Sequence, residues 1–162
     1  MKILLAVDGS PCSDAAVEEV ARRPWPEGSA VKILTAFELP MPPTPEAWAL
    51  PANYFAEMDV ALRDQGQRIV EGALATLKSR VDKNISVDAA ILPGPPRIVI
   101  LDEAESWGAD LIVVGSHGYH AWERFLLGSV SQSVVSHAKC SVEVVRCRPA
   151  DERTKQQAQK KR

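Results

Sequence analysis

The chain has 162 residues and a formal net charge of −2 at pH 7. This length is sufficient for one globular domain that needs neither a disulfide nor a metal ion for stability. The charged fraction of 25% is ordinary for a globular fold, and the slightly negative balance excludes a generally basic nucleic-acid-binding protein. No apolar run approaches the roughly 20 residues that span a bilayer. We therefore expect a cytoplasmic protein with no membrane segment and no nucleic-acid partner.

Patterns typical of strands and helices alternate along the chain. Residues 3–7 form a continuous apolar run, which is typical of a strand buried on both faces. Asp8-Gly9-Ser10-Pro11 ends this run, and Ser10 and Pro11 suit the N-cap and first turn of a helix. That helix is predicted to reach Arg23. The later predictions are strands at 30–37, 85–91, 110–114 and 142–147, and helices at 54–81, at 98–107 and from Gly128 onward.

Proline is the unusual residue in the composition, with 12 copies, of which five lie between Pro40 and Pro51. The connection that contains them is too long for an ordinary one, so we expect a lid, a partner-contact loop or a mobile flap at 40–51. At the other end, residues 148–162 hold few apolar side chains and finish in three positive charges. We expect this segment to be a disordered basic tail behind a domain at 1–147.

The alternating order predicts a three-layer, doubly wound α/β sandwich, in which a parallel sheet carries helices on both faces. Ligands of such folds bind beyond the carboxyl ends of the strands, where the strand order reverses. Two predicted strand ends carry suitable residues, Asp8-Gly9-Ser10 after the first strand and Gly115-Ser116-His117-Gly118 after the fourth. These two strand ends are therefore the candidate ligand-binding segments.

The glycine-rich segment 115–131 has features of a phosphate site. Gly115 and Gly118 allow positive φ and close approach of a ligand to the backbone. Gly128 and Ser129 open a helix, whose N-terminal N–H groups and dipole suit an anion. The segment lacks the lysine of a P-loop. An ordinary strand-to-helix loop with turn glycines fits the same residues, so both interpretations stay open at this level.

The spacing Gly115-x2-Gly118-x9-Gly128-Ser129 resembles the nucleotide-binding signature of the universal stress protein family. Three further segments resemble the same family: ILLAVDGS at 3–10, the Gly94-Pro95 turn and the run 128–146. The resemblance covers residues 1–147 and implies a five-stranded parallel sheet of order 3-2-1-4-5. It also implies membership of the ATP-binding subclass and a homodimer joined through the last strand, 142–147.

By this resemblance, the ligand is ATP, or AMP or ADP in its place, with Mg²⁺ carried on the nucleotide. Asp8 would hydrogen-bond the ribose hydroxyls. The backbone of Ala36 would contact adenine, with Ala6 and Val114 nearby. The phosphates would be held by Gly115, Gly118, Gly128, Ser129 and Val130, with Ser116, His117 and Ser131 as further contacts. The sequence contains no recognisable set of protein metal ligands and no catalytic residue that we can name.

Several residues have a second interpretation. Asp8 also fits the cap of the following helix beside Ser10, and His117 and His120 fit exposed loop positions. Cys12, Cys140 and Cys147 form no CxxC pair, so we expect reduced thiols, with Cys12 buried and inert rather than reactive. Glu143 and Arg146 are candidates for ion pairs across the dimer axis.

These observations favour a nucleotide-dependent stress-response or signalling module over an enzyme. A slow ATP hydrolase or phosphotransferase is one alternative, although no lysine stands beside the glycines to clamp phosphate charge. A nucleotide-independent interaction module is the other, and it would bind partners through the proline-rich loop and the basic tail.

Overall fold

The computed structural model describes residues 1–39, 53–118 and 127–147. The predictions made for the loop 40–51, for His120 and for the tail 148–162 fall outside these residues. The described part contains five strands and four helices in strict alternation. They are β1 (Lys2–Ala6), α1 (Pro11–Arg22), β2 (Ala30–Phe37), α2 (Tyr54–Arg80), β3 (Ser86–Pro93), α3 (Pro96–Trp107), β4 (Leu111–Gly115), α4 (Ser129–His137) and β5 (Ser141–Val145).

All strand pairs are parallel, and the sheet order is β3-β2-β1-β4-β5. This confirms the predicted α/β sandwich and its strand order. The predicted element boundaries differ from the observed ones by at most two residues, and those of β2 agree at both ends. The alternating pattern of β3 correctly placed it at a sheet edge, where one face is less covered than in β1 or β4.

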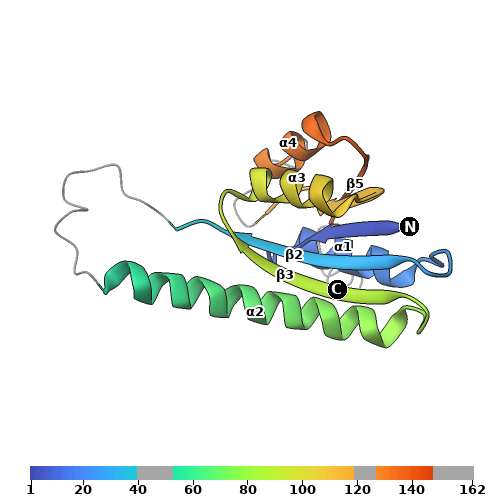
Figure 1. Ribbon diagram of the computed structural model, residues 1–162, viewed down its shortest axis with the longest axis horizontal. Helices are drawn as coiled ribbons and strands as arrows, with labels where there is room; N and C mark the ends of the chain where they lie inside the picture. Colours follow the sequence, from blue (N-terminus) through green and yellow to red (C-terminus); the bar gives the residue numbers. More distant parts are fainter. Residues whose placement is uncertain (40–52, 119–126, 148–162) are drawn as a thin grey trace, which may run out of the picture.

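Helices cover both faces of the sheet, as Figure 1 shows, with α2 below it and α3 and α4 above it. Successive residues of β1 point to opposite faces, which divides the core into two halves. Ile3 and Leu5 pack with α1 and α2, whereas Leu4 packs with α3 and α4. All three side chains have 0% exposure. A continuous apolar run is therefore what a central strand with two covered faces requires.

The start of α1 follows the prediction made from Ser10 and Pro11. Ser10 is the N-cap, and its hydroxyl accepts a hydrogen bond from the Ser13 amide at 3.3 Å. Pro11 occupies the first helical turn, where its missing N–H costs nothing. This cap fixes the direction of the chain between β1 and α1, and so fixes the position of Asp8, which lies in that connection.

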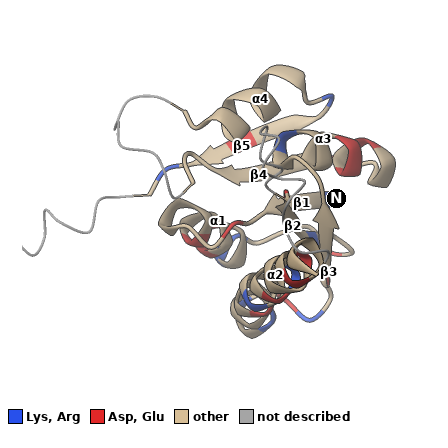
Figure 2. Cartoon of the chain, turned by 90° about the vertical axis from the view of Figure 1, so that its left-hand side faces the viewer, with Lys and Arg blue, Asp and Glu red and all other residues tan. Residues whose placement is uncertain are grey.

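No helix in the described part of the chain is both long enough and apolar enough to cross a bilayer. Charged residues lie along α1, α2 and α3, as Figure 2 shows, whereas α4 contains no Lys, Arg, Asp or Glu.

Candidate functional site

A cavity of about 430 Å³ opens at the carboxyl ends of the central strands. The chain runs from β1 outward to β2 and β3, and then returns to β4 on the other side of β1. The ends of β1 and β4 are therefore the point where the strand order reverses, which is where ligands bind in this class of fold. Figure 2 looks onto this end of the sheet. The volume lies within the range of small-molecule sites.

The structure brings together the residues that the sequence predicted for the site. All of them except Ser116 line the cavity: Ala6, Asp8, Ala36, Val114, Gly115, His117, Gly118, Gly128, Ser129, Val130 and Ser131. The lining residues that the sequence analysis missed are Val7, Ser13, Leu34, Pro96 and Ile100. Leu34 was detectable, because it lies two positions before Ala36 and so shares its face of β2.

One end of the cavity is apolar. Leu34 and Ala36 come from β2, Val114 from β4, and Ile100 covers them from α3. Ile100 and Val114 are almost completely buried, with 4% and 3% exposure. Their side chains hold no hydrogen-bonding group, so contacts of a planar ring with this end would rely on van der Waals packing and on backbone groups at the strand ends.

The other end of the cavity is polar and is built around Asp8. The Oδ1 atom of Asp8 accepts a hydrogen bond from the Ser10 amide at 2.9 Å, and the Asp8 amide donates to the Ser13 hydroxyl at 3.2 Å. Ser10 therefore caps α1, while Asp8 shapes the loop before it and still lines the cavity. The two interpretations of Asp8, as a loop-shaping residue and as a ligand contact, are compatible in this geometry.

Gly115 and Gly118 are needed for close approach and not for positive φ. Neither has a positive φ, which corrects one reason given for them from the sequence. A Cβ on Gly115 would lie 2.7 Å from the Cys12 carbonyl carbon, and a Cβ on Gly118 would lie 2.7 Å from Asp8 Oδ2. Real Cβ atoms do not come so close to other atoms, so a larger residue at position 115 would displace the backbone at the start of α1, and one at position 118 would displace the Asp8 carboxylate.

The N-terminus of α4 forms the wall opposite Asp8. Its N-cap is Gly128, which has no side chain, and Ser129 and Val130 line the cavity in its first turn. The Gly128 amide donates to the Ser116 carbonyl at 2.8 Å, which ties this helix to the loop after β4. The hydroxyl of Ser131 lies 2.9 Å from the carbonyl oxygens of both Ser116 and Gly128. The Ser131 hydroxyl thus links the loop after β4 to the start of α4, and Ser131 also lines the cavity.

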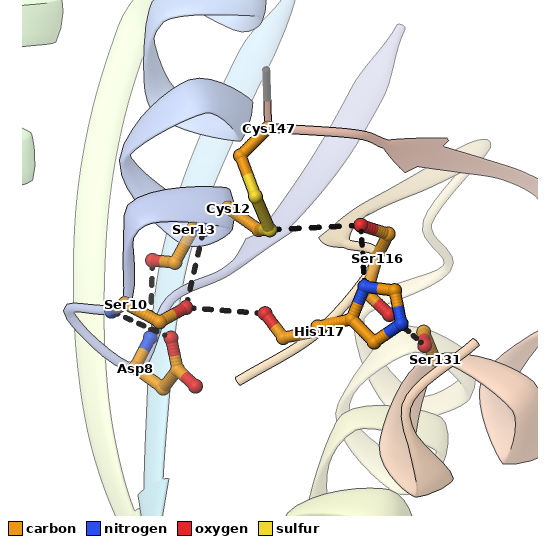
Figure 3. The surroundings of a disulfide bond; sticks show 8 residues. All are labelled: Asp8, Ser10, Cys12, Ser13, Ser116, His117, Ser131 and Cys147. Carbon is orange, nitrogen blue, oxygen red and sulfur yellow. Dashed lines mark hydrogen bonds between the residues drawn. A yellow bond between two sulfur atoms is a disulfide. The ribbon is translucent and has the colours of Figure 1, made fainter. Parts of the chain in front are cut away.

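Ser116 lies behind the cavity wall and is 2% exposed. Its amide donates to the Val145 carbonyl at 2.7 Å. Its hydroxyl lies 3.6 Å from Cys12 Sγ and 3.0 Å from His117 Nδ1, as Figure 3 shows. Nε2 of His117 is buried and has no hydrogen-bond partner among the described residues. Ser116 therefore connects a sulfur atom to an imidazole that lines the cavity.

The expectation of three reduced cysteines is wrong for two of them. Cys12 and Cys147 form a disulfide, and Cys140 is the free cysteine. The two bonded residues are 135 positions apart in the sequence, but their Cα atoms are 4.5 Å apart in the fold. The pairing arises because Cys147, two residues after β5, lies beside the start of α1, as Figure 3 shows.

None of the described residues that line the cavity is Lys or Arg, and Asp8 is the one residue among them with a carboxylate. Burial raises the pKa of the neighbouring Asp14 carboxyl, and the charges of Asp8 and Glu18 raise it further. Asp8, Asp14 and Glu18 thus place several carboxylates near the start of α1. An anionic ligand would depend on N–H donors of the glycine segment and α4, and on a cation of its own.

Comparison with known proteins identifies the family. The model of the universal stress protein family matches residues 1–146. Universal stress protein YxiE of Bacillus subtilis is 28% identical over 148 residues, covering 90% of this chain and 98% of the relative. Universal stress protein A homolog 2 of Coxiella burnetii is 52% identical over 64 residues. That match spans 39% of this chain and only 43% of the relative.

Solved structures have the same fold. The hypothetical protein MJ0577 is 24% identical with a TM-score of 0.76, covering 92% of this chain and 97% of its own. An Arabidopsis thaliana universal stress protein family protein with AMP bound is 21% identical, with a TM-score of 0.65 and 94% of each chain covered. A universal stress protein in complex with cAMP is 23% identical, with a TM-score of 0.61, covering 91% of this chain and 98% of its own. The chain thus belongs to the universal stress protein family.

Proposed function

We propose that this chain is an ATP-binding universal stress protein that acts as a nucleotide-dependent stress-response or signalling module. The observation that carries the proposal is one cavity with two chemically different ends at the reversal point of the sheet. Its apolar end suits a purine base, and its glycine-lined polar end suits a ribose and phosphates. The structural neighbours that contain AMP and cAMP support an adenine nucleotide as the ligand class.

Each part of the nucleotide has a proposed partner. Adenine would lie between Ile100 and the end of β2, where the backbone of Ala36 can accept and donate hydrogen bonds. The ribose hydroxyls would donate to the carboxylate of Asp8, which is held in place by the Ser10 amide at 2.9 Å. The phosphates would follow the glycines to the N-terminus of α4, where unpaired N–H groups and the helix dipole favour negative charge.

Mg²⁺ would enter with the nucleotide. The described cavity lining offers no Lys or Arg to neutralise a triphosphate, which makes a cation carried on the phosphates the natural source of positive charge. Mg²⁺ commonly keeps several waters and binds through substrate phosphates with few protein ligands. No catalytic residue is proposed, because nothing in the described lining supplies both a charge clamp and a positioned nucleophile.

Thermal unfolding of the full chain with and without Mg-ATP tests the proposal. At a ligand concentration 100 times Kd, linkage stabilises the folded state by about 2.7 kcal/mol, which corresponds to a Tm rise of roughly 5–10 °C for a domain of this size. Mass spectrometry of ligand released from gently purified protein is the companion measurement. No Tm shift at millimolar ATP, together with no released nucleotide, would favour a nucleotide-independent interaction module.

A slow ATP hydrolase is the enzymatic alternative. His117 is the one titratable side chain besides Asp8 in the described lining, so it is the residue that hydrolysis would need. We expect the wild-type protein to hydrolyse ATP far more slowly than ordinary kinases turn over. In His117→Ala we expect no more than a trace of hydrolysis. Turnover on the order of 1 s⁻¹ or faster, abolished by that substitution, would support an enzyme instead.

We also propose a homodimer joined through β5, and action in the cytoplasm. β5 is an edge strand of the sheet, and unpaired edges are commonly covered. Within the chain, Glu143 forms an ion pair with Arg23, and a contact of Glu143 across the axis would share its carboxylate with that pair. Light scattering at high micromolar concentration tests the dimer, and a monomer there contradicts it. Cell fractionation tests the location.

A further inference from the structure

The disulfide between Cys12 and Cys147 lies directly behind the candidate site, and the proposed function does not use it. Cys12 is the second residue of α1 and is 4% exposed, whereas Cys147 is partly exposed. The bond joins the start of α1, which follows Asp8, to the residues directly after β5. Cystine bonds are uncommon in the cytoplasm, and those found there are usually transient and redox-sensing. Because the cytoplasm is the proposed location, a disulfide that opens and closes fits this protein better than a permanent one.

We propose that Cys12 and Cys147 form a redox-active pair that controls nucleotide binding, with the disulfide form binding tightly and the dithiol form weakly. The nucleotide part of this inference rests on the function proposed above. The redox-active pair itself is a separate claim about the two cysteines.

The first link between the pair and the site is a backbone contact. An added Cβ on Gly115 would lie 2.7 Å from the carbonyl carbon of Cys12 and 2.9 Å from its carbonyl oxygen. The two backbones thus touch with no space between them. Gly115 lines the cavity, so a shift of Cys12 on release of its sulfur moves the cavity wall.

The second link is the hydroxyl of Ser116. It lies 3.6 Å from Cys12 Sγ and 3.0 Å from His117 Nδ1, and a hydroxyl has one proton to donate. A disulfide sulfur is a weak acceptor, so in the closed form the proton can go to Nδ1, which puts the imidazole proton on Nε2 as a donor for phosphate. A Cys12 thiolate is a much stronger acceptor and draws the Ser116 proton to itself. Nδ1 must then hold the imidazole proton, and Nε2 becomes an acceptor that repels phosphate oxygens.

The third link ties the loop after β4 to both ends of the pair. The Ser10 hydroxyl lies 3.2 Å from the His117 carbonyl oxygen, to which it donates. The Ser116 amide donates to the Val145 carbonyl, two residues before Cys147. The loop that would hold the phosphates is thus held between the two segments that the disulfide joins. Opening the bond removes the covalent link between these two anchoring segments.

The chemical step is thiol–disulfide exchange with a small dithiol. A reductant thiolate attacks the Sγ atom of Cys147, which is the more exposed residue of the pair, and the S–S bond breaks with its electron pair on Cys12 Sγ. The helix N-terminus and the Ser116 hydroxyl stabilise the departing thiolate. The second thiol of the reductant then attacks the mixed disulfide and releases Cys147. Two electrons and one proton pass to the protein, which leaves Cys147 as a thiol and Cys12 as a thiolate. The other proton of the dithiol goes to solvent, and the reductant becomes a cyclic disulfide; oxidised glutathione reverses the reaction.

Coupling between the two sites is reciprocal. If the disulfide form binds nucleotide fivefold more tightly, then saturating nucleotide must make the disulfide fivefold harder to reduce. For a two-electron couple this factor lowers the midpoint potential by about 20 mV. Such a shift is a readout that a purely structural disulfide, without contact to the pocket, would not produce.

The experiment compares the full chain in two states, treated with oxidised glutathione or with dithiothreitol. Free-thiol counting first checks the state: one reactive thiol is expected after oxidation and three after reduction, since the chain has three cysteines. Isothermal titration with AMP and with Mg-ATP then gives Kd. We expect at least a fivefold weaker Kd after reduction. Cys147→Ser should bind like the reduced protein in both conditions, and Cys140→Ser should keep the full redox response.

The outcomes separate the two proposals. Equal Kd values in the two states, with thiol counts of one and three, would overturn the redox control and leave the proposed function intact. Three reactive thiols after oxidation would overturn the redox-active pair itself. No nucleotide binding in either state would overturn the proposed function, and the control of binding with it. If Cys147→Ser does not fold, the oxidised and reduced wild-type proteins still decide the question, with circular dichroism as the check on folding.

Discussion

The carboxylate of Asp8 lies against Gly118, so closely that a Cβ on Gly118 would stand 2.7 Å from Asp8 Oδ2. The other oxygen of this carboxylate, Oδ1, accepts a hydrogen bond from the Ser10 amide at 2.9 Å, which favours the observed position. Two loops that are distant in sequence, one after β1 and one after β4, thus depend on each other for their positions. The candidate site lies at this junction.

Gly118→Ala should therefore reduce the affinity for nucleotide clearly and reduce the thermal stability of the protein only slightly. The new methyl group must push the Asp8 carboxylate off its position, and that carboxylate is the proposed ribose contact. We expect about a tenfold loss of affinity for both AMP and Mg-ATP by isothermal titration, with Tm changed by less than about 3 °C. Gly72→Ala is the matched control, because its added Cβ has nothing within 4 Å. Unchanged affinity in Gly118→Ala would argue against Asp8 as a ligand contact.

Gly115→Ala should act mainly on stability. Its Cβ would meet backbone atoms of Cys12 and Ser13 at 2.7–2.9 Å, and a backbone cannot rotate aside as a side chain can. Overpacking of this kind costs about 1–3 kcal/mol, measurable as a lower urea midpoint with an unchanged slope. Gly72→Ala again serves as the control and should gain up to about 1 kcal/mol, because alanine is the better helix former. A midpoint equal to that of the wild type would show that α1 can move away from β4 at little cost.

The fold was largely predictable because its signals are local. A central parallel strand covered on both faces must be a continuous apolar run, and β1 and β4 are such runs. The helix start at Ser10 and Pro11 is equally local, since the cap bonds the amide of Ser13 three residues later. The strand order came from the family resemblance and not from these signals.

The parts of the site that escaped prediction depend on contacts between distant segments. Cys12 and Cys147 have no spacing rule that would pair them, because their proximity results from β5 lying beside β4. The hydrogen bond of the Ser131 hydroxyl to the Ser116 carbonyl was not predicted, because side-chain direction in a first helical turn is not encoded in residue type. Ile100 was missed because the residues that a helix lays over a strand end depend on how the helix packs.

Arg23 should stabilise the fold in a pH-dependent way. Its two terminal nitrogens each donate to Glu143 at 2.6 Å, and its Nε donates to Glu19 at 2.9 Å. Burial alone would raise the pKa of Glu19, but hydrogen bonds from Arg23 and Arg22 outweigh it and lower that pKa from its ordinary value. A lowered carboxyl pKa in the folded state means that the stabilisation is present above the unfolded pKa and is lost as the pH falls through the folded value.

Arg23→Met should thus cost about 1 kcal/mol of unfolding free energy at pH 7, after allowance for solvent screening of these partly exposed groups. The difference from wild type should shrink as the pH falls below about 4. Urea denaturation at pH 7 and pH 3 measures both. Arg63→Met is the comparison, since Arg63 forms an exposed i,i+4 pair with Asp59 and should cost less than about 0.5 kcal/mol. A cost for Arg23→Met that stays constant down to pH 3 would indicate lost packing instead of lost ion pairs.

Removal of Mg²⁺ should distinguish ATP from AMP at the proposed site. The described cavity lining contains no Lys or Arg, and the Asp8 carboxylate adds a negative charge. A triphosphate therefore needs its own cation far more than a monophosphate does. We expect excess EDTA to weaken ATP binding by at least tenfold and AMP binding by less than twofold, by isothermal titration at fixed ionic strength.

Asp8→Asn completes that test, because it separates a ribose contact from a metal contact. The ribose is common to both nucleotides, so a residue that binds it should, when altered, reduce the affinity for AMP and for Mg-ATP by the same factor. A direct ligand of Mg²⁺ would instead affect Mg-ATP alone, and its effect would vanish in EDTA. Equal losses for the two nucleotides, each retained in EDTA, are the result we expect. A loss confined to Mg-ATP would show that Asp8 contacts the metal ion and not the ribose. The binding mode proposed for the polar end of the cavity would then be wrong.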